Sequence, residues 1–220
     1  MHGIHVSGVE ATIATVFDAS DPLDRDQARI LVRTLPDVFP NLNLQPEDVT
    51  FSASDDLYQF NLQIRFFGGK GSAEITAHRL TLAFSGIQLV RDVELVSNIF
   101  LGVSHLLREK ATRAVSTFGI SFPAEIKTGG DRNSYFSSLV IPANGQLPEG
   151  LVYYRAEPGF PDQVRVSVER SDDLPQGIFY TWTALFHGVL TGEITGALKT
   201  SVTDSLLDLH LEFTESSIVL

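Results

Sequence analysis

Histidines and paired acids are the residues of this sequence that could carry acid–base or metal chemistry. No two histidines have the four-residue spacing that would place both on one face of a helix as metal ligands. The pairs Asp55-Asp56 and Asp172-Asp173 suggest the two carboxylates of a glycosidase, but adjacent turn residues point in different directions and usually accept backbone N–H bonds or face water. We therefore predict no metal site, no cofactor and no catalytic residue. The six histidines are His2, His5, His78, His105, His187 and His210.

Common catalytic and phosphate-binding motifs are absent from the sequence. It has no Gly-x-Ser-x-Gly elbow, no His-Glu-x-x-His pair and no dinucleotide-binding glycine fingerprint. The segment 66–72, Phe-Phe-Gly-Gly-Lys-Gly-Ser, suggests a phosphate loop, but Gly71 follows Lys70 where a Walker loop requires Ser or Thr. Because strand-like residues flank this segment, it predicts a glycine-rich hairpin turn.

An aromatic cluster between residues 153 and 186 is the feature that most favours binding. Two interpretations remain open: a hydrophobic core between sheet and helix, or an apolar pocket or interface whose Tyr hydroxyls and indole N–H orient a ligand or partner. Tyr180, Trp182 and Phe186 fall on one side of a predicted strand. The candidate ligand- or partner-binding residues are Trp182, Tyr180, Phe186, Tyr154 and His187.

Composition indicates an acidic globular chain. It has 220 residues, 43% of them hydrophobic, with 16 basic and 27 acidic side chains, a net charge of −11 and no cysteine. A chain of this length buries a substantial core without disulfides. The lack of cysteine excludes disulfides, thiolate metal sites and thiol nucleophiles. The negative charge argues against nucleic-acid binding, which depends on Lys and Arg.

Three segments of the sequence lack the features of a targeting or membrane-spanning signal. The amino terminus lacks the basic region of a signal peptide. The apolar stretches 89–107 and 177–198 contain charged residues and fall short of the roughly 18 uncharged residues of a spanning helix. We therefore expect no membrane span and a cytoplasmic location.

The hydrophobic periodicity predicts an α+β fold, in which a dominant antiparallel sheet packs against one long and one short helix. The short helix is predicted over 22–35, between Asp21-Pro22 and Pro36, and the long one over 96–118, with Phe100 and Leu107 on its buried face. Segment 128–138 is predicted as a loop. For 206–213 a strand is predicted, with a helix as the alternative because Asp204, Asp208 and Glu212 recur every four residues. The other predicted strands are Leu57–Phe67, Glu74–Phe84, Gln163–Arg170 and Ile178–Phe186.

Short similarities suggest a tandem duplication that divides the chain into closely packed halves, 1–118 and 119–220. The first half is predicted as strand, helix, meander and helix, and the second as mainly antiparallel strands. The alternative is chance similarity among common strand and turn residues. The matching pairs begin at Gly3 and Gly119, Ser54 and Ser171, Glu74 and Glu193, and Asp92 and Asp208.

Three classes of function follow from these observations. The first is a non-enzymatic protein-interaction module, such as an adaptor, assembly subunit or inhibitor, that binds a protein partner or a second copy through a sheet edge or an aromatic face. The second is a binding protein for an apolar small molecule held between sheet and helix. The third is a hydrolase or isomerase that uses dispersed residues such as His78, His187, Asp55 and Tyr180.

Overall fold

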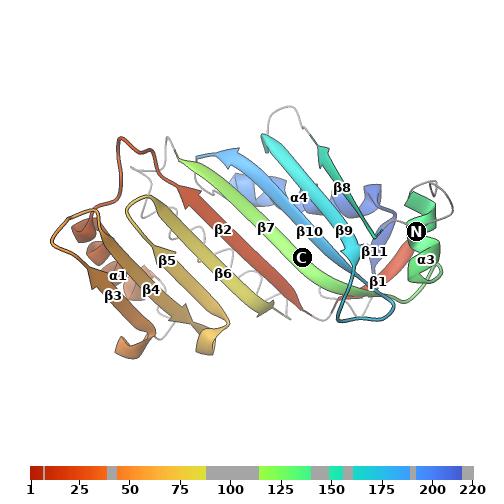
Figure 1. The fold of residues 1–220 in the computed structure, drawn as a ribbon, viewed down its shortest axis with the longest axis horizontal. Coiled ribbons are helices and arrows are strands. Elements are labelled where there is room, and N and C mark those ends of the chain that lie inside the picture. The colour runs from red at the N-terminus through yellow and green to blue at the C-terminus, as the bar shows by residue number, and fades with distance from the viewer. Residues whose placement is uncertain are drawn as a thin grey trace.

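The computed structural model describes residues 1–6, 8–38, 44–87, 114–139, 149–155, 161–188 and 192–214. These residues form eleven strands and three α-helices. The strands belong to one sheet, and its pairings are antiparallel except for one short parallel pair at the amino terminus. The predicted α+β class with a dominant antiparallel sheet is therefore confirmed (Figure 1).

The sheet runs from β3 at one edge to β8 at the other, and β2 and β7 lie side by side near its middle. β1 (His2–Val6) pairs with the end of β7 and with β11 (Leu211–Phe213). Across the sheet the order is β3 (Val49–Ala53), β4 (Phe60–Phe66), β5 (Gly71–Ile75), β6 (Arg79–Ile87), β2 (Val9–Val16), β7 (Val115–Ile126), β10 (Gly177–His187), β9 (Gln163–Arg170) and β8 (Gly150–Arg155).

Two helices, α1 (Arg25–Val38) and α4 (Gly192–Asp208), lie behind the same face of the sheet (Figure 1). A third, α3 (Arg132–Leu139), lies near β1 at the β8 end. We call this the covered face and the opposite one the open face. None of the described helices lies over the open face, which is turned toward the viewer in Figure 1.

The core lies between the covered face and the helices. Along β10 the even-numbered residues from Ile178 to Phe186 are buried, whereas Phe179 and His187 on the other side are exposed. On α4, Leu198, Val202 and Leu206 recur every four residues and are buried, as expected for one helical face packed against a sheet. Buried residues at every second position of β10 thus face the same core as buried residues at every fourth position of α4.

The short predicted helix exists with shifted ends. Its cap is Asp24, whose carboxylate accepts the N–H of Gln27 at 2.7 Å while the Gln27 side chain accepts the N–H of Asp24 at 3.0 Å. This reciprocal pair is a capping box, which starts the helix at Arg25, after the predicted Asp21-Pro22 start. The helix continues through Pro36 to Val38, so the prediction that Pro36 ends it is wrong.

The long predicted helix over 96–118 is wrong at its carboxyl end, because Val115–Phe118 begins strand β7. Gly119, the residue directly after the predicted helix, lies within β7 opposite Thr12 and Thr183. Residues 96–113, including Phe100 and Leu107, lie outside the described residues.

Two further strand predictions needed correction or resolution. Segment 74–84 is two strands, β5 and β6, joined by a turn in which the N–H of Thr76 donates to the carbonyl of Arg79 at 2.8 Å. That turn contains no Gly, Asn or Pro to mark it in the sequence. Segment 206–213 is the end of α4 followed by β11, so the helical alternative was right as far as Asp208.

The predicted loop over 128–138 is wrong because α3 begins at Arg132. The Asp131 carboxylate accepts both the N–H of Ser134, at 2.8 Å, and its hydroxyl, at 2.6 Å. This is an N-cap of the ordinary kind, and Asp131, a residue type preferred at helix N-caps, was its signal in the sequence.

The tandem duplication stays a prediction. The two Asp-Asp pairs both lie in turns between paired antiparallel strands, β3–β4 and β9–β10. Glu74 lies in β5, however, whereas Glu193 lies in α4, so this match does not join equivalent elements. The topological counterpart of β7 is β2. After β2 come α1 and the strands β3 to β6, and β6 pairs with β2; after β7 come α3 and the strands β8 to β10, and β10 pairs with β7. The predicted division at residue 118 falls inside β7, and the sheet continues across it.

Candidate functional site

Three of the predicted binding residues belong to the core. Tyr180, Trp182 and Phe186 are completely buried on the covered face of β10. The ring of Tyr180 stacks on Phe122 with centroids 4.9 Å apart, and Trp182 meets Phe118 edge to face at 6.2 Å. The sequence placed these aromatic residues on one side of a strand, and the structure covers that side. They present no surface to a protein partner.

Polar atoms are buried within the same layer. The hydroxyls of Tyr135 and Tyr180 have no hydrogen-bond partner in the described part of the chain, and Tyr153 donates to the carbonyl of Ser205 at 3.4 Å. Burial raises the pKa of Tyr135 and Tyr180 above the usual tyrosine value, and the neighbouring Tyr153 adds to both shifts. Buried hydroxyls in native proteins are normally hydrogen-bonded, so this tyrosine cluster (Tyr135, Tyr153 and Tyr180) is unusual.

His187 lies at the exposed end of β10, where its Nδ1 is 2.6 Å from Oδ2 of Asp162. A His–Asp pair serves catalysis when it activates a nucleophile. Ser116 lies opposite Phe186 on β7 and is buried; its hydroxyl donates to the carbonyl of Gly188 at 2.7 Å and lies 3.0 Å from the hydroxyl of Thr15. His187 and Asp162 thus join the end of β10 to the start of β9, and among the described residues no interaction links His187 to a nucleophile.

The dispersed residues of the enzyme hypothesis are not brought together. Tyr180 faces the core, whereas Asp55, His78 and His187 are exposed, and no described interaction joins any two of these four residues. Within the described ranges, no group of three His, Asp or Glu side chains is arranged to hold a metal ion.

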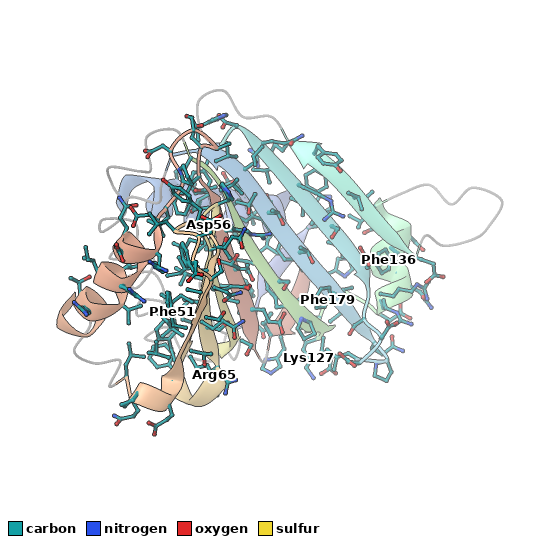
Figure 2. The ribbon with its side chains drawn as sticks, turned by 60° about the vertical axis from the view of Figure 1, so that its left-hand side comes forward. Phe51, Asp56, Arg65, Lys127, Phe136 and Phe179 are labelled. Atoms are coloured by element: carbon teal, nitrogen blue, oxygen red, sulfur yellow. The ribbon has the colours of Figure 1, made fainter. Side chains whose placement is uncertain are left out.

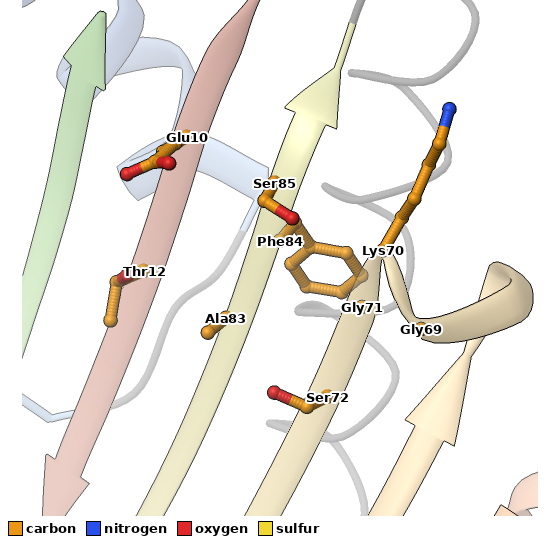
Figure 3. A pocket seen from close by; sticks show the side chains of 9 residues that line it. All are labelled: Glu10, Thr12, Gly69, Lys70, Gly71, Ser72, Ala83, Phe84 and Ser85. Atoms are coloured by element: carbon orange, nitrogen blue, oxygen red, sulfur yellow. The ribbon is translucent and has the colours of Figure 1, made fainter.

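A hollow of about 180 Å³ lies on the open face over β2, β6 and β5 (Figure 3). Its walls are mostly small or hydroxyl-bearing residues such as Thr12, Ser72 and Ala83, with the glycine-rich turn after β4 at one end. This turn joins antiparallel β4 and β5, so the predicted hairpin is confirmed. Glu10 and Lys70 lie on opposite sides of the hollow and their charged ends do not meet, so they provide no acid–base pair (Figure 3).

The remaining predicted residue, Tyr154, lies on β8, the last strand of the sheet, with 64% of its surface exposed. Val152 is next to it on the open face and is 46% exposed. The alternate residues Leu151 and Tyr153 pack against the core. The sequence analysis missed Val152, although the run Leu-Val-Tyr-Tyr lacks the proline or charge that usually protects an edge strand.

The outer backbone of β8 can be assigned from its register. Gly150 lies opposite Glu169, and the N–H of Arg170 donates to the carbonyl of Glu149 at 3.1 Å. Antiparallel residues alternate between those bonded across the pair and those pointing away. Glu149, Leu151, Tyr153 and Arg155 therefore bond toward β9, whereas the N–H and C=O groups of Gly150, Val152 and Tyr154 point outward. We call this outward side, with these last three residues, the β8 edge.

Charges around the β8 edge are balanced, although the chain carries a net charge of −11. Arg155 contacts Asp208 of α4 at 3.2 Å, and Arg170 contacts Glu149 at 3.4 Å. On the open face of β9, Arg165 lies opposite Tyr154 and Glu169 opposite Gly150. Among the described residues, three basic and three acidic side chains thus lie around the edge, without the acidic excess of the whole chain.

No protein-family model matches this chain, and no curated protein matches it in sequence. Fold and surface alone therefore define its class: an α+β protein whose sheet is covered on one face and ends in an apolar edge strand. Of the helices in the described ranges, none is both long and apolar enough to cross a membrane.

Proposed function

We propose that this chain is a non-enzymatic protein-interaction module that binds an extended protein segment along the β8 edge. The observation that carries the proposal is the combination of outward backbone groups at Gly150, Val152 and Tyr154 with the exposed side chains of the last two. An added strand would gain main-chain hydrogen bonds from the backbone and specificity from alternate side chains.

The arrangement of β8 supports this function because the strand is already held in place. Its inner residues pack against the core, the Tyr153 hydroxyl donates to the carbonyl of Ser205, and Arg155 contacts Asp208. A strand fixed in its extended form loses little conformational entropy when a partner pairs with it. An edge strand with exposed apolar residues can pair with another chain, and it is prone to aggregation when no partner covers it.

Site-specific photocrosslinking tests the proposal. A benzophenone amino acid placed at Tyr154, in protein produced in its own host, should crosslink to one defined segment of one protein, identified by mass spectrometry. The matched control places the same group at Tyr58, an exposed tyrosine in the β3–β4 turn.

The variant Val152→Pro makes the test specific for strand pairing. Proline removes an N–H that points outward, so the bonds between β8 and β9 remain while an added strand loses a donor. The proposal expects the crosslink from position 154 to disappear in this variant. Equal, diffuse products from positions 154 and 58, or products that persist in Val152→Pro, would contradict it.

The tyrosine cluster favours a second candidate function, the binding of a small molecule between sheet and helices. The supporting observation is that Tyr135 and Tyr180 bury hydroxyls without a described partner, because hydroxyls of this kind can orient the acceptor oxygen of a largely apolar ligand. Native mass spectrometry of protein purified from its own host tests this function. A retained mass that is lost in a Tyr135→Phe, Tyr180→Phe double variant would support it, and an unmodified mass would count against it.

A further inference from the structure

We infer that the segment paired with the β8 edge is the β8 edge of a second copy of this chain, in antiparallel register with Val152 opposite Val152. This inference rests on the proposed function and names its partner. The inference follows from the self-complementarity of residues 150–155 together with Glu149, which precedes them.

Backbone geometry restricts the possible registers. In a dimer of antiparallel strands related by a twofold axis perpendicular to the sheet, residue i of one copy lies opposite residue j of the other. The sum of i and j is the same for every opposite pair. Opposite side chains must lie on the same face, so that sum is even. With Val152 on the axis, Gly150 lies opposite Tyr154 of the second copy, and all three outward-pointing residues bond to outward-pointing residues.

The side chains on the open face match in this register. The two Val152 side chains meet at the axis. In the single chain this side chain is about half exposed, and the contact would cover it. The ring of Tyr154 lies over Gly150 of the second copy, which has no side chain to obstruct it. Aromatic residues opposite strand glycines cover backbone that is otherwise exposed. The two exposed apolar side chains of the edge are thereby both covered.

On the covered face the same register brings opposite charges together. Leu151 lies opposite Tyr153, an apolar pair, and Glu149 lies opposite Arg155 at both ends of the contact. The Glu149 side chain is 88% exposed, so it can reach Arg155 of the second copy. Opposite charges directly across an antiparallel pair are stabilising. A chain with net charge −11 would repel its own copy elsewhere, but this edge is locally balanced.

Helix α4 adds area next to the paired strands. Ser205 and Asp208 contact Tyr153 and Arg155 of β8, so this end of α4 lies beside the edge. Leu207, between these two positions in the sequence, is 50% exposed. Six paired residues alone bury little surface, and a stable interface needs roughly 1,000 Å² or more. The exposed leucine is therefore the residue of α4 that we expect to be covered in the dimer.

The absence of cysteine makes a disulfide test of this register direct, because any introduced thiol can pair only with another introduced thiol. Val152→Cys should form a covalent dimer under mild oxidation. Ala53→Cys, at an exposed position of the opposite edge strand β3, is the matched control and should stay mainly monomeric.

Two further cysteine variants distinguish this register from all others. Glu149→Cys and Arg155→Cys should each dimerise poorly alone, because neither residue lies opposite its own copy. Mixed together, they should form a covalent heterodimer, because 149 lies opposite 155 of the second copy. A heterodimer no more abundant than the two homodimers would overturn the register.

Sedimentation of the full chain measures the association without a crosslink. The dimer fraction should rise with protein concentration, Val152→Pro should weaken dimerisation by roughly tenfold or more, and Ala53→Pro should leave it unchanged. Circular dichroism of each variant checks that the fold is kept. A wild-type monomer at all concentrations, together with a crosslink from position 154 to a different protein, would overturn the dimer while leaving the proposed function in place. A monomer with no such crosslink would overturn both.

Discussion

The edge strands β3 and β8 present different side chains on the open face. In β3 these are Thr50 and Ser52, two hydroxyl residues, whereas in β8 they are Val152 and Tyr154. Both strands also pack apolar residues against the core, Val49 and Phe51 in β3 and Leu151 and Tyr153 in β8. The same sheet thus has one edge that water can solvate and one that buries apolar surface only when another chain covers it.

The aromatic residues of the two edges are also used differently. Phe51 of β3 lies on the α1 side of the sheet, stacked on Phe60 with centroids 6.3 Å apart and with the guanidinium of Arg29 5.1 Å from its ring centre (Figure 2). Tyr154 of β8 has most of its surface exposed. Acidic residues, Glu47-Asp48 and Asp55-Asp56, flank β3 on both sides, whereas charges around β8 are balanced. The two edges therefore differ in the way that the proposed association through β8 requires.

The largest effect is expected inside the β8 half. Trp182→Ala should lower the free energy of unfolding by about 3–5 kcal/mol, because it leaves a cavity in a fully buried site. Chemical denaturation measures this loss. Tyr154→Ala is the exposed counterpart and should change stability by less than about 0.5 kcal/mol. If Trp182→Ala left stability intact and abolished binding instead, the aromatic side of β10 would be the partner site after all.

A smaller effect is expected for the aromatic residue of the β3 edge. Phe51→Ala should cost about 2 kcal/mol of stability, less than a fully buried phenylalanine, because Phe51 is only partly buried between Phe60 and Arg29. Thermal unfolding of Phe51→Ala and Tyr154→Ala, measured side by side, compares the two losses of stability. Equal losses for the two variants would show that both edge aromatics serve the monomer, which would remove the distinction between the edges.

The tyrosine cluster lies in the β8 half and should make the protein sensitive to alkali. Burial raises the pKa of Tyr180 in the folded state, so its stabilising contribution is complete below the unfolded value of about 10 and is lost as pH rises toward the folded pKa. Tyr180→Phe should reduce this loss and, by removing an unpartnered hydroxyl, raise stability near neutral pH by up to about 1 kcal/mol. Unfolding curves and tyrosinate absorbance at several pH values measure both effects. A destabilised Tyr180→Phe would show that the hydroxyl is bonded, and would favour the ligand-binding alternative.

The smallest expected effect comes from transferring the β8 surface to β3. The double variant Thr50→Val, Ser52→Tyr should increase self-association by about twofold to fivefold, because each cross-strand apolar pair contributes up to about 1 kcal/mol. Sedimentation of this double variant combined with Val152→Pro, which weakens association through β8, measures association through the altered β3 edge. Unchanged association would indicate that the acidic flanks, and not the hydroxyl residues, protect β3.

Residue patterns in the sequence predicted some of this structure directly. The period of two in 163–170 and 178–186 corresponds to β9 and β10, and the glycine-rich segment after Phe66 forms a hairpin turn. These signals are local, since a period of two and a glycine-rich turn depend on neighbouring residues only. Competing local patterns explain the errors: apolar alternation continued into the end of α4, and an unmarked turn joined β5 to β6.

Tertiary structure alone decided which of the candidate residues are accessible. Tyr180 and Tyr154 are both tyrosines in strands of similar pattern, yet one is completely buried and the other is mostly exposed. The difference arises because β10 lies between two strands above α4, whereas β8 is the last strand of the sheet. Strand order depends on pairing between segments far apart in the chain, and a period of two is the same at an edge as in the interior. The sequence by itself therefore predicted the strand that contains Tyr180, and only the tertiary structure showed that 150–155 is also a strand and that it ends the sheet.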